Sequence, residues 1–506
     1  MTEGLSASVK RSRNRKIIPD ITQRCRILII FTNLITQANS GPVLSDRSTI
    51  TSPMTSAERR AVTGLAGIYG VRMLGLFLIL PVFALYAEDL PGATPLLIGL
   101  AVGVYGLTQA ILQIPFGMLS DRIGRKPVIL GGLVLFAAGS VIAALADDIW
   151  LILIGRAIQG SGAIAAAVMA LAADVTRESQ RTKAMATIGM TIGAAFALSL
   201  MGGPLIDAVV GVSGIFWLTA ILAVLAIVIV IFVIPSPDAK PRHLDALPLP
   251  GMFKRVLRDG QLLRLDYGIF SLHLMLTAMF LSLPLLLRDL GLPLHQHAFL
   301  YLAVLLSAIL LMVPFIIMAE KYGRMKVVFV GAVATVSAAA LAMNILSLDW
   351  LGVAVVLVVF FIGFNLLEAT LPSLIAKTAP VEAKGTAMGV YSTSQFMGGF
   401  LGGMLGGWVH QQYGYSWVFV AVAIVGAIWL IVALSMQSPG QFRNRIVSLS
   451  PLSAASIATM QQQLLATQGV VEAVVMADEK VAYLKLDRNN LDESALEALL
   501  ATVDSH

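Results

Sequence analysis

The chain contains little cysteine and little charge, and each shortage excludes a class of protein. Its single cysteine, Cys25, excludes a disulfide framework and a thiolate metal site. Charged residues make up 13% of the 506 residues and hydrophobic residues 57%, more apolar surface than a soluble chain of this length can bury. The composition therefore predicts an integral membrane protein. The net charge of +6 is modest, and we expect no nucleic-acid partner.

Sequence patterns typical of enzymes are also missing. The chain has no nucleotide-binding loop of the form G-x-x-x-x-G-K-[ST], and no Ser/His/Asp, paired-carboxylate or HExxH arrangement at a usable spacing. His295 and His297 share an apparent loop, where a metal is the less favoured interpretation. We therefore expect no enzymatic activity, no metal and no cofactor.

Apolar runs of about 20 residues, each able to cross about 30 Å of hydrocarbon, recur along the chain. They form two sets of six around a polar stretch: 62–86, 97–117, 127–146, 149–173, 183–206 and 213–234, then 264–288, 298–319, 325–347, 350–376, 385–410 and 415–436. The predicted fold class is an all-α membrane protein with twelve transmembrane helices in two six-helix halves. Basic residues gather in the even-numbered turns, which places both termini in the cytoplasm of a multi-pass inner-membrane protein.

The remaining segments predict three further regions beside the halves 54–234 and 264–438. Residues 1–53 read as a disordered cytoplasmic extension, or as sequence upstream of a true start at Met54. Residues 235–263 read as a linker whose amphipathic stretch either lies on anionic headgroups or is a plain tether. Residues 443–506 follow the order β-α-β-β-α, with Asp492 as a helix cap and a hairpin at 477–480. This order predicts a cytosolic ferredoxin-like domain without its last strand, acting either as a sensor or as a stabilising appendage.

Four ionisable residues lie deep inside predicted spans, where each costs at least about 2.5–3.5 kcal/mol. Arg72, Arg156, His273 and Glu368 fall in spans 1, 4, 7 and 10, and no other span is expected to carry a deep charge. A nested three-helix repeat predicts that these helices line one water-filled cavity. Tyr69, Gln159 and Asn365 are the polar neighbours expected there.

Each of these side chains has a functional and a structural interpretation. Burial favours the protonated form of Glu368, which makes it the leading proton carrier. Arg72 keeps its charge and can hold an anion or a carboxylate. Arg156 either takes part in proton relay or forms a fixed ion pair, and His273 either relays protons or is a neutral imidazole bonded across helices.

A charged turn, P-F-G-M-L-S-D-R-I-G-R-K at 115–126, returns in degenerate form at 314–324, offset by 199 residues (323 − 124). Such duplication in a membrane bundle is typical of transporters. The first copy resembles motif A of the major facilitator superfamily, and Arg156-Ala157-Ile158-Gln159-Gly160-Ser161-Gly162 resembles its motif B. In span 5, Gly203-Pro204 resembles the antiporter motif C, but Leu205-Ile206-Asp207 departs from it.

The resemblance implies a conformational latch, in which the acid of motif A caps a helix of the other half and its second arginine pairs with an acid that ends helix four. The residues implied are Gly117, Asp121, Arg122, Gly124, Arg125 and Asp174, with Glu320, Gly323 and Arg324 in the second copy. Arg156 is implied in proton coupling. Stretches at 72–75, 365–373 and 390–396, together with the small tail domain, resemble the YajR type within this superfamily.

The leading hypothesis is a proton-coupled secondary transporter that exports drugs or small metabolites by alternating access. Its expected partners are the lipid bilayer, protons and a small-molecule substrate, and we expect a monomer. Two alternatives stay open: a membrane sensor with the tail as its ligand-binding or output module, and an uncoupled facilitator or importer.

Overall fold

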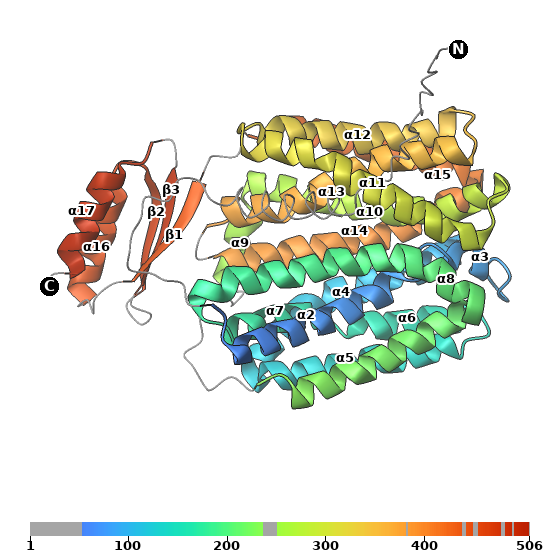
Figure 1. The fold of residues 1–506 in the computed structure, drawn as a ribbon, viewed down its shortest axis with the longest axis horizontal. Coiled ribbons are helices and arrows are strands. Elements are labelled where there is room, and N and C mark those ends of the chain that lie inside the picture. The colour runs from blue at the N-terminus through green and yellow to red at the C-terminus, as the bar shows by residue number, and fades with distance from the viewer. Residues whose placement is uncertain are drawn as a thin grey trace, which may run out of the picture. The chain divides into compact units, whose positions relative to one another are not determined.

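The computed structural model describes residues 53–235, 250–380, 383–437, 442–448, 454–476, 481–487 and 490–504. Figure 1 shows long helices running side by side, and a small sheet covered on one face by two helices. The expectations for residues 1–52, for most of the central linker and for the 477–480 hairpin fall outside the described residues.

The first half is built from seven helical elements. They are α2 (Ser56–Phe77), α3 (Phe83–Ala87), α4 (Pro95–Ile123), α5 (Arg125–Ala144), α6 (Ile149–Ser161), α7 (Ala165–Asp174) and α8 (Glu178–Phe232). The first and fourth predicted spans are each split in two, as α2–α3 and α6–α7. Conversely, α8 covers 55 residues because it comprises two helices that meet at a kink without a loop between them. Its one non-helical residue, Gly211 (φ 70°), separates the fifth and sixth spans.

The helices of the second half follow the expected spans closely, and a short helix, α9, precedes them. They are α9 (Pro250–Val256), α10 (Gly260–Asp289), α11 (Leu294–Glu320), α12 (Met325–Ile345), α13 (Trp350–Thr378), α14 (Lys384–Tyr413) and α15 (Ser416–Leu434). Among the described residues, nine helices are long and apolar enough to cross a membrane, α8 counting once. α2 and α14 are not among these nine helices. Arginine residues lower the mean hydropathy of α2, and glycine and polar residues lower that of α14. With these two and both parts of α8, the twelve predicted spans are confirmed.

The tail forms a separate small core. Strands β1 (Phe442–Ser448), β2 (Val470–Met476) and β3 (Val481–Asp487) pair antiparallel in the order β1-β3-β2. Helices α16 (Ala454–Ala466) and α17 (Glu493–Asp504) supply Leu464 and Leu496, which pack against Leu484 of β3. Asp492 caps α17 as expected, because the backbone N–H of Ala495 and the Ser494 hydroxyl donate to it and lower its pKa.

The duplicated turns share one backbone requirement. Gly124, between α4 and α5, has φ 99°, and Gly323, between α11 and α12, has φ 66°. Only glycine adopts such values readily, which explains a glycine at the same place in both copies. Both turns lie at the same end of the bundle, which we call the motif end; the other end, with the α3–α4 and α10–α11 loops, is the opposite end.

The two halves meet most closely along α4 and α14, between the middle of the bundle and the opposite end. A Cβ atom added at Gly103 would lie 2.7 Å from the carbonyl oxygen of Phe400, and one at Gly106 would lie 2.6 Å from that of Phe396. A Cβ at Gly403 would overlap the carbonyl oxygen of Gly99. These glycines let the two backbones touch, as small residues do between membrane helices.

This contact predicts that Gly403→Ala lowers stability because the added methyl group forces α4 and α14 apart. We expect a loss of about 1–3 kcal/mol, seen as a lower midpoint of thermal unfolding in detergent. The matched control is Gly389→Ala on the same helix, where an added Cβ meets nothing within 4 Å. It should leave the midpoint unchanged or raise it, since alanine favours helix. Equal midpoints for the two variants would contradict the close contact.

Candidate functional site

A break in the fourth span positions the first buried arginine. The helix stops at Ser161 and resumes at Ala165, and in this break the carbonyl oxygen of Gly162 accepts a hydrogen bond from the backbone N–H of Ile164 at 2.8 Å. The Arg72 guanidinium of α2 donates a short hydrogen bond to that carbonyl oxygen. Its Nε donates to the hydroxyl of Tyr105 on α4 at 3.2 Å. Arg72 therefore joins α2 and α4 to the break in the fourth span, where it is a second donor to the Gly162 carbonyl oxygen.

Arg156 lies on α6 in the same cluster and is fully buried. Its Nη1 donates to the side-chain oxygen of Gln159 and to the carbonyl oxygen of Gly75, the latter at 3.3 Å. Its guanidinium carbon lies 4.8 Å from the centre of the Tyr105 ring, within cation–π range. Gln159 in turn donates to Ser140 at 2.8 Å, so motif B is held by an uncharged hydrogen-bonded chain.

These two arginines have no carboxylate partner among the described residues. Arg72 is 1% exposed and Arg156 0% exposed. Within the described chain, Nη2 of Arg72 and both Nε and Nη2 of Arg156 make no hydrogen bond. Neutral oxygens and one aromatic ring thus stabilise two positive charges, which leaves the core of the first half electropositive.

The second half holds a different cluster, made by α10, α13 and α14. The His273 Nε2 lies 2.8 Å from the Gln395 amide nitrogen and 4.0 Å from a Glu368 oxygen. The Gln395 amide nitrogen also lies 3.5 Å from the other Glu368 oxygen. The His273 Nδ1 lies 3.3 Å from the carbonyl oxygen of Ile269. A neutral imidazole that donates through Nδ1 and accepts through Nε2 satisfies this geometry.

The structure divides the four predicted charges into these two clusters instead of placing them around one shared cavity. Arg72 and Arg156 are sealed among packed helices, whereas the Glu368 side chain is 36% exposed. Tyr69 and Asn365 are half-buried on the same helices as Arg72 and Glu368. The two halves differ in this way because the nested repeat determines only which helices carry a charged residue. The side chains of neighbouring helices determine whether that residue is sealed or exposed.

Two further residues of the second half belong with this cluster. Gln395 joins His273 to Glu368, and an amide gives no charge by which a sequence scan could single it out. Asp266 on α10 is 5% exposed, and neither carboxylate oxygen has a hydrogen-bond partner in the described chain. Asp266 is therefore a second buried ionisable residue in span 7, beside His273, and the four predicted deep charges did not include it. Asp266 lies near the predicted start of span 7, so from the sequence alone it is expected at the level of the lipid headgroups and not at depth in the membrane.

An aromatic layer separates the second cluster from the opposite end. Phe196 of α8 stacks on Phe364 of α13 at 5.8 Å, across the boundary between the halves. The ring of Phe361, which is one turn nearer the opposite end on α13, lies 6.2 Å from the ring of Phe196. Glu368 is one turn from Phe364 on the motif-end side. The accessible acid is thus divided from the opposite end by packed rings and by the α4–α14 contact.

Polar contacts also join the halves at the opposite end. Arg288, at the end of α10, donates to Glu88 of the α3–α4 loop at 2.6 Å. Its Nε lies 3.3 Å from Asp289, which accepts a hydrogen bond from the Tyr415 hydroxyl at 2.6 Å. The backbone N–H of Leu96 donates to the Gln411 side chain at 3.3 Å. The opposite end of the bundle is closed in this conformation.

The motif turn is held by its own ion pairs. Arg125 pairs with Asp121 one turn away, and its Nε lies 3.3 Å from Asp174 at the end of α7. It also donates to the Ser120 hydroxyl at 2.7 Å. The arginine–acid pair that the family resemblance implies at the end of the fourth span is therefore present. Gly117 lets α4 approach Ala166 of α7, whereas Arg122, Glu320 and Arg324 lie exposed at this end.

Of the two neighbouring histidines, His297 is part of the packing and His295 is exposed. Both lie in the first turn of α11 and not in a loop, because the helix begins at Leu294. His297 is fully buried, and its Nε2 lies 3.1 Å from the carbonyl oxygen of Leu292. Across the residues that the structure describes, no group of three or more His, Cys, Asp or Glu side chains could hold a metal ion.

Comparisons with known proteins agree with this architecture. The family model described as Major Facilitator Superfamily matches residues 65–399 and 267–460. The inner membrane transport protein YajR of Escherichia coli K12 is 47% identical over 434 residues, covering 86% of this chain and 95% of that protein. The multidrug resistance protein MdtH of Yersinia enterocolitica is 25% identical over 349 residues, covering 67% of this chain and 84% of that protein.

Solved structures share the fold. A bacterial homologue of the human lysosomal transporter Spinster, in an inward-facing and occupied conformation, matches with a TM-score of 0.63 and 13% identity, over 75% of this chain and 97% of that one. The human organic anion transporter MFSD10 matches with a TM-score of 0.55 and 19% identity, over 74% and 99%. By the match to the family model and by its identity to a relative covered almost in full, the chain belongs to the Major Facilitator Superfamily, whose members are transporters and not enzymes.

Proposed function

We propose that this transporter is driven by protons and exports small molecules by alternating access. The observation that carries the proposal is the Glu368–Gln395–His273 cluster: an acid, an amide and an imidazole from three helices, within hydrogen-bond or ion-pair reach of one another. The Glu368 side chain is 36% exposed, although its Oε2 atom is buried and makes no hydrogen bond within the described chain. An acid in that position gains or loses a charge that the surrounding helices must accommodate.

The cluster links protonation to the boundary between the halves. Gln395 is next in sequence to Phe396, whose carbonyl oxygen forms part of the close contact with Gly106 of α4. When Glu368 is ionised, the Gln395 amide has a charged acceptor; when Glu368 is protonated, that attraction weakens. A change of charge therefore alters the forces on α14, the helix on which the other half rests.

Asp266 is a second candidate proton-binding group in the proposed cycle. A buried carboxylate that makes no hydrogen bond is stable only when protonated, or when another conformation supplies a partner. Tyr391 of α14 also has a buried hydroxyl group without a hydrogen bond among the described residues. Arg72 and Arg156 provide fixed positive charge in the other half, to which an anionic substrate group or a carboxylate is attracted.

The conformation supports an assignment of direction. Rings, glycines and ion pairs join the halves towards the opposite end, while Glu368 lies one turn from Phe364 on the motif-end side of these contacts. The basic turns place the motif end in the cytoplasm, with both termini, and the E. coli relative is named an inner membrane protein. We infer an inward-facing, monomeric inner-membrane transporter, in which the pairs of Asp121, Arg125 and Asp174 act as the latch that changes between states.

Export of drugs or small metabolites is the proposed direction of transport. Relatives at about a quarter identity are named multidrug resistance proteins, and phenylalanines line the seal beside Glu368. A susceptibility screen of a strain that overproduces the protein, against drugs and metabolites, should identify compounds to which the strain becomes more resistant. Increased sensitivity without any resistance would indicate import instead.

Proton coupling predicts that Glu368→Gln abolishes transport driven by a pH gradient, since the amide cannot ionise. In proteoliposomes, a compound from the screen should no longer accumulate against its gradient, while downhill exchange should persist because glutamine mimics the protonated acid. Arg156→Ala should reduce both modes, because the motif B arginine supports Gln159 and Gly75. Asp89→Asn, an exposed acid at the opposite end, serves as the control. If Glu368→Gln and Arg156→Ala both transport normally under the gradient, the coupling assignment fails.

The Arg288–Glu88 pair predicts a measurable bias in conformation. Its side chains are 48% and 36% exposed, so solvent screens the pair and its contribution is about 0.2–1 kcal/mol. Glu88→Gln should therefore raise the population open at the opposite end by no more than about fivefold. Pulsed electron spin resonance distances between labels at positions 89 and 295, in a background without Cys25, report this population.

The reversed pair, Glu88→Arg with Arg288→Glu, should restore the original distance distribution, because the attraction across the boundary is rebuilt. Asp147→Asn, an exposed acid at the same end, is the control and should have no effect. In 1 M salt the difference between Glu88→Gln and the native protein should shrink. A distance distribution that is unchanged by Glu88→Gln at low salt would show that the pair plays no part in closing this end.

A further inference from the structure

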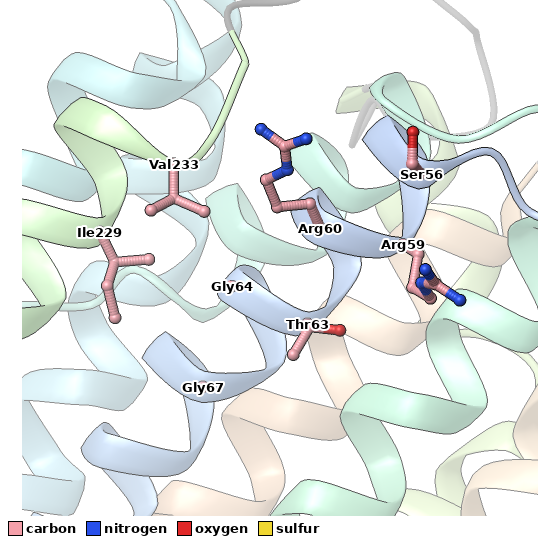
Figure 2. Close-up of a pocket in the computed structure, with 8 residues that line it drawn as sticks. All are labelled: Ser56, Arg59, Arg60, Thr63, Gly64, Gly67, Ile229 and Val233. Carbon is pink, nitrogen blue, oxygen red and sulfur yellow. The ribbon is translucent and has the colours of Figure 1, made fainter.

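A crevice at the motif end lies apart from both charge clusters, between the start of α2 and the last turns of α8 (Figure 2). It has a volume of about 600 Å³. Its walls are Ser56, Arg59, Arg60, Thr63, Gly64 and Gly67 from α2, with Ile229 and Val233 from α8. Two guanidinium groups, from Arg59 and Arg60, lie at its mouth near the start of α2, and the floor of the crevice is apolar.

The floor is shaped by missing side chains. Gly64 and Gly67 lie on the same face of α2. A Cβ atom added at Gly67 would meet nothing within 4 Å, whereas one at Gly64 would lie 2.7 Å from Cδ1 of Ile234, so the open part of the floor is at Gly67. Ile229 and Val233, one turn apart on α8, form the facing apolar wall. Figure 2 shows Arg60 extending into the space between α2 and this wall. From Arg60 to Gly67 the crevice follows α2 for about 10.5 Å.

The charge at the mouth is not neutralised by the protein residues described. The side chains of Arg59 and Arg60 are exposed and form no ion pair within the described part of the chain. The neighbouring acid, Glu58, is 7% exposed and turned away from the crevice. It accepts from the Arg177 guanidinium at 2.9 Å and from the backbone N–H of Thr55 at 2.8 Å. The positive end of the α2 helix dipole adds to the two guanidinium charges.

We propose that this crevice is a binding site for one anionic phospholipid of the cytoplasmic leaflet. Arg59 and Arg60 hold the phosphate, for which the guanidinium group offers a planar pair of donors. One acyl chain lies in the open space over Gly67, beside Ile229 and Val233. Basic residues at the cytoplasmic surface attract anionic lipid, and the apolar floor extends towards the hydrocarbon region. The proposal is independent of proton coupling and of the substrate.

Native mass spectrometry of the full chain in detergent, titrated with phosphatidylglycerol, tests the headgroup contact. The double variant Arg59→Gln with Arg60→Gln should bind the lipid about thirtyfold more weakly, since each basic residue near the surface contributes roughly fivefold. Phosphatidylcholine binding should change little, because its headgroup carries no net charge. Lys183→Gln, which removes an exposed basic residue elsewhere in the first half, is the control and should match the native protein.

A second pair of variants tests the acyl-chain contact without changing charge. Gly67→Leu fills the open floor and should weaken phosphatidylglycerol binding, whereas Gly131→Leu, on α5 with equally open space, should not. Inorganic phosphate at the same concentrations should fail to displace the lipid, because it lacks the apolar contacts. The proposal is overturned if the arginine variant binds phosphatidylglycerol like the native protein, if phosphatidylcholine binding falls equally, or if Gly67→Leu and Gly131→Leu behave alike.

Discussion

The hydrocarbon core penalises every unpaired polar group, and this constraint explains the most unusual features of the bundle. Arg72 could not remain at its depth without acceptors, and the fourth span supplies one by breaking at Gly162. In the break, the Gly162 carbonyl oxygen accepts from the backbone N–H of Ile164 and, through its second lone pair, from Arg72. The break therefore gives a buried charge a backbone acceptor from another helix. Motif B extends the same solution, because Arg156 is surrounded by Gln159, Gly75 and the Tyr105 ring.

The two halves share one helical arrangement but carry different kinds of charge. Both place a left-handed glycine in the motif turn, at Gly124 and Gly323, and both carry ionisable residues on the first helix of a triplet. The first half concentrates fixed positive charge in a sealed core, whereas the second holds titratable groups, of which Glu368 is accessible. Attraction between an electropositive half and an ionised acid in the other depends on the protonation of that acid. The division suits a transporter in which one half provides a constant field and the other responds to protons.

The periodic and compositional features of the sequence account for most of the fold. The twelve spans and the β-α-β-β-α tail follow from apolar run length and strand or helix patterns, and the observed elements agree within a few residues. The breaks at 78–82 and 162–164 could not be predicted, because their stability comes from contacts far apart in sequence, such as Arg72 with Gly162. Gln395 and Asp266 were missed for the same reason. An amide bridge is defined by its two partners, and the burial of an acid near the end of a span depends on which helices cover it.

Mechanical coupling in the second half depends on the position of one helix. α14 carries Gln395 on the face that meets His273 and Glu368. Its contact with α4 is made by Gly403, Gly407 and the backbone of Phe396 and Phe400. Since a backbone-to-backbone contact has no side chain to absorb displacement, a small movement of α14 must be transmitted to α4 or must open the interface. α4 ends in the motif turn, where Asp121 pairs with Arg125. A single pair of helices thus connects the protonatable cluster, the seal between the halves and the turn at the motif end.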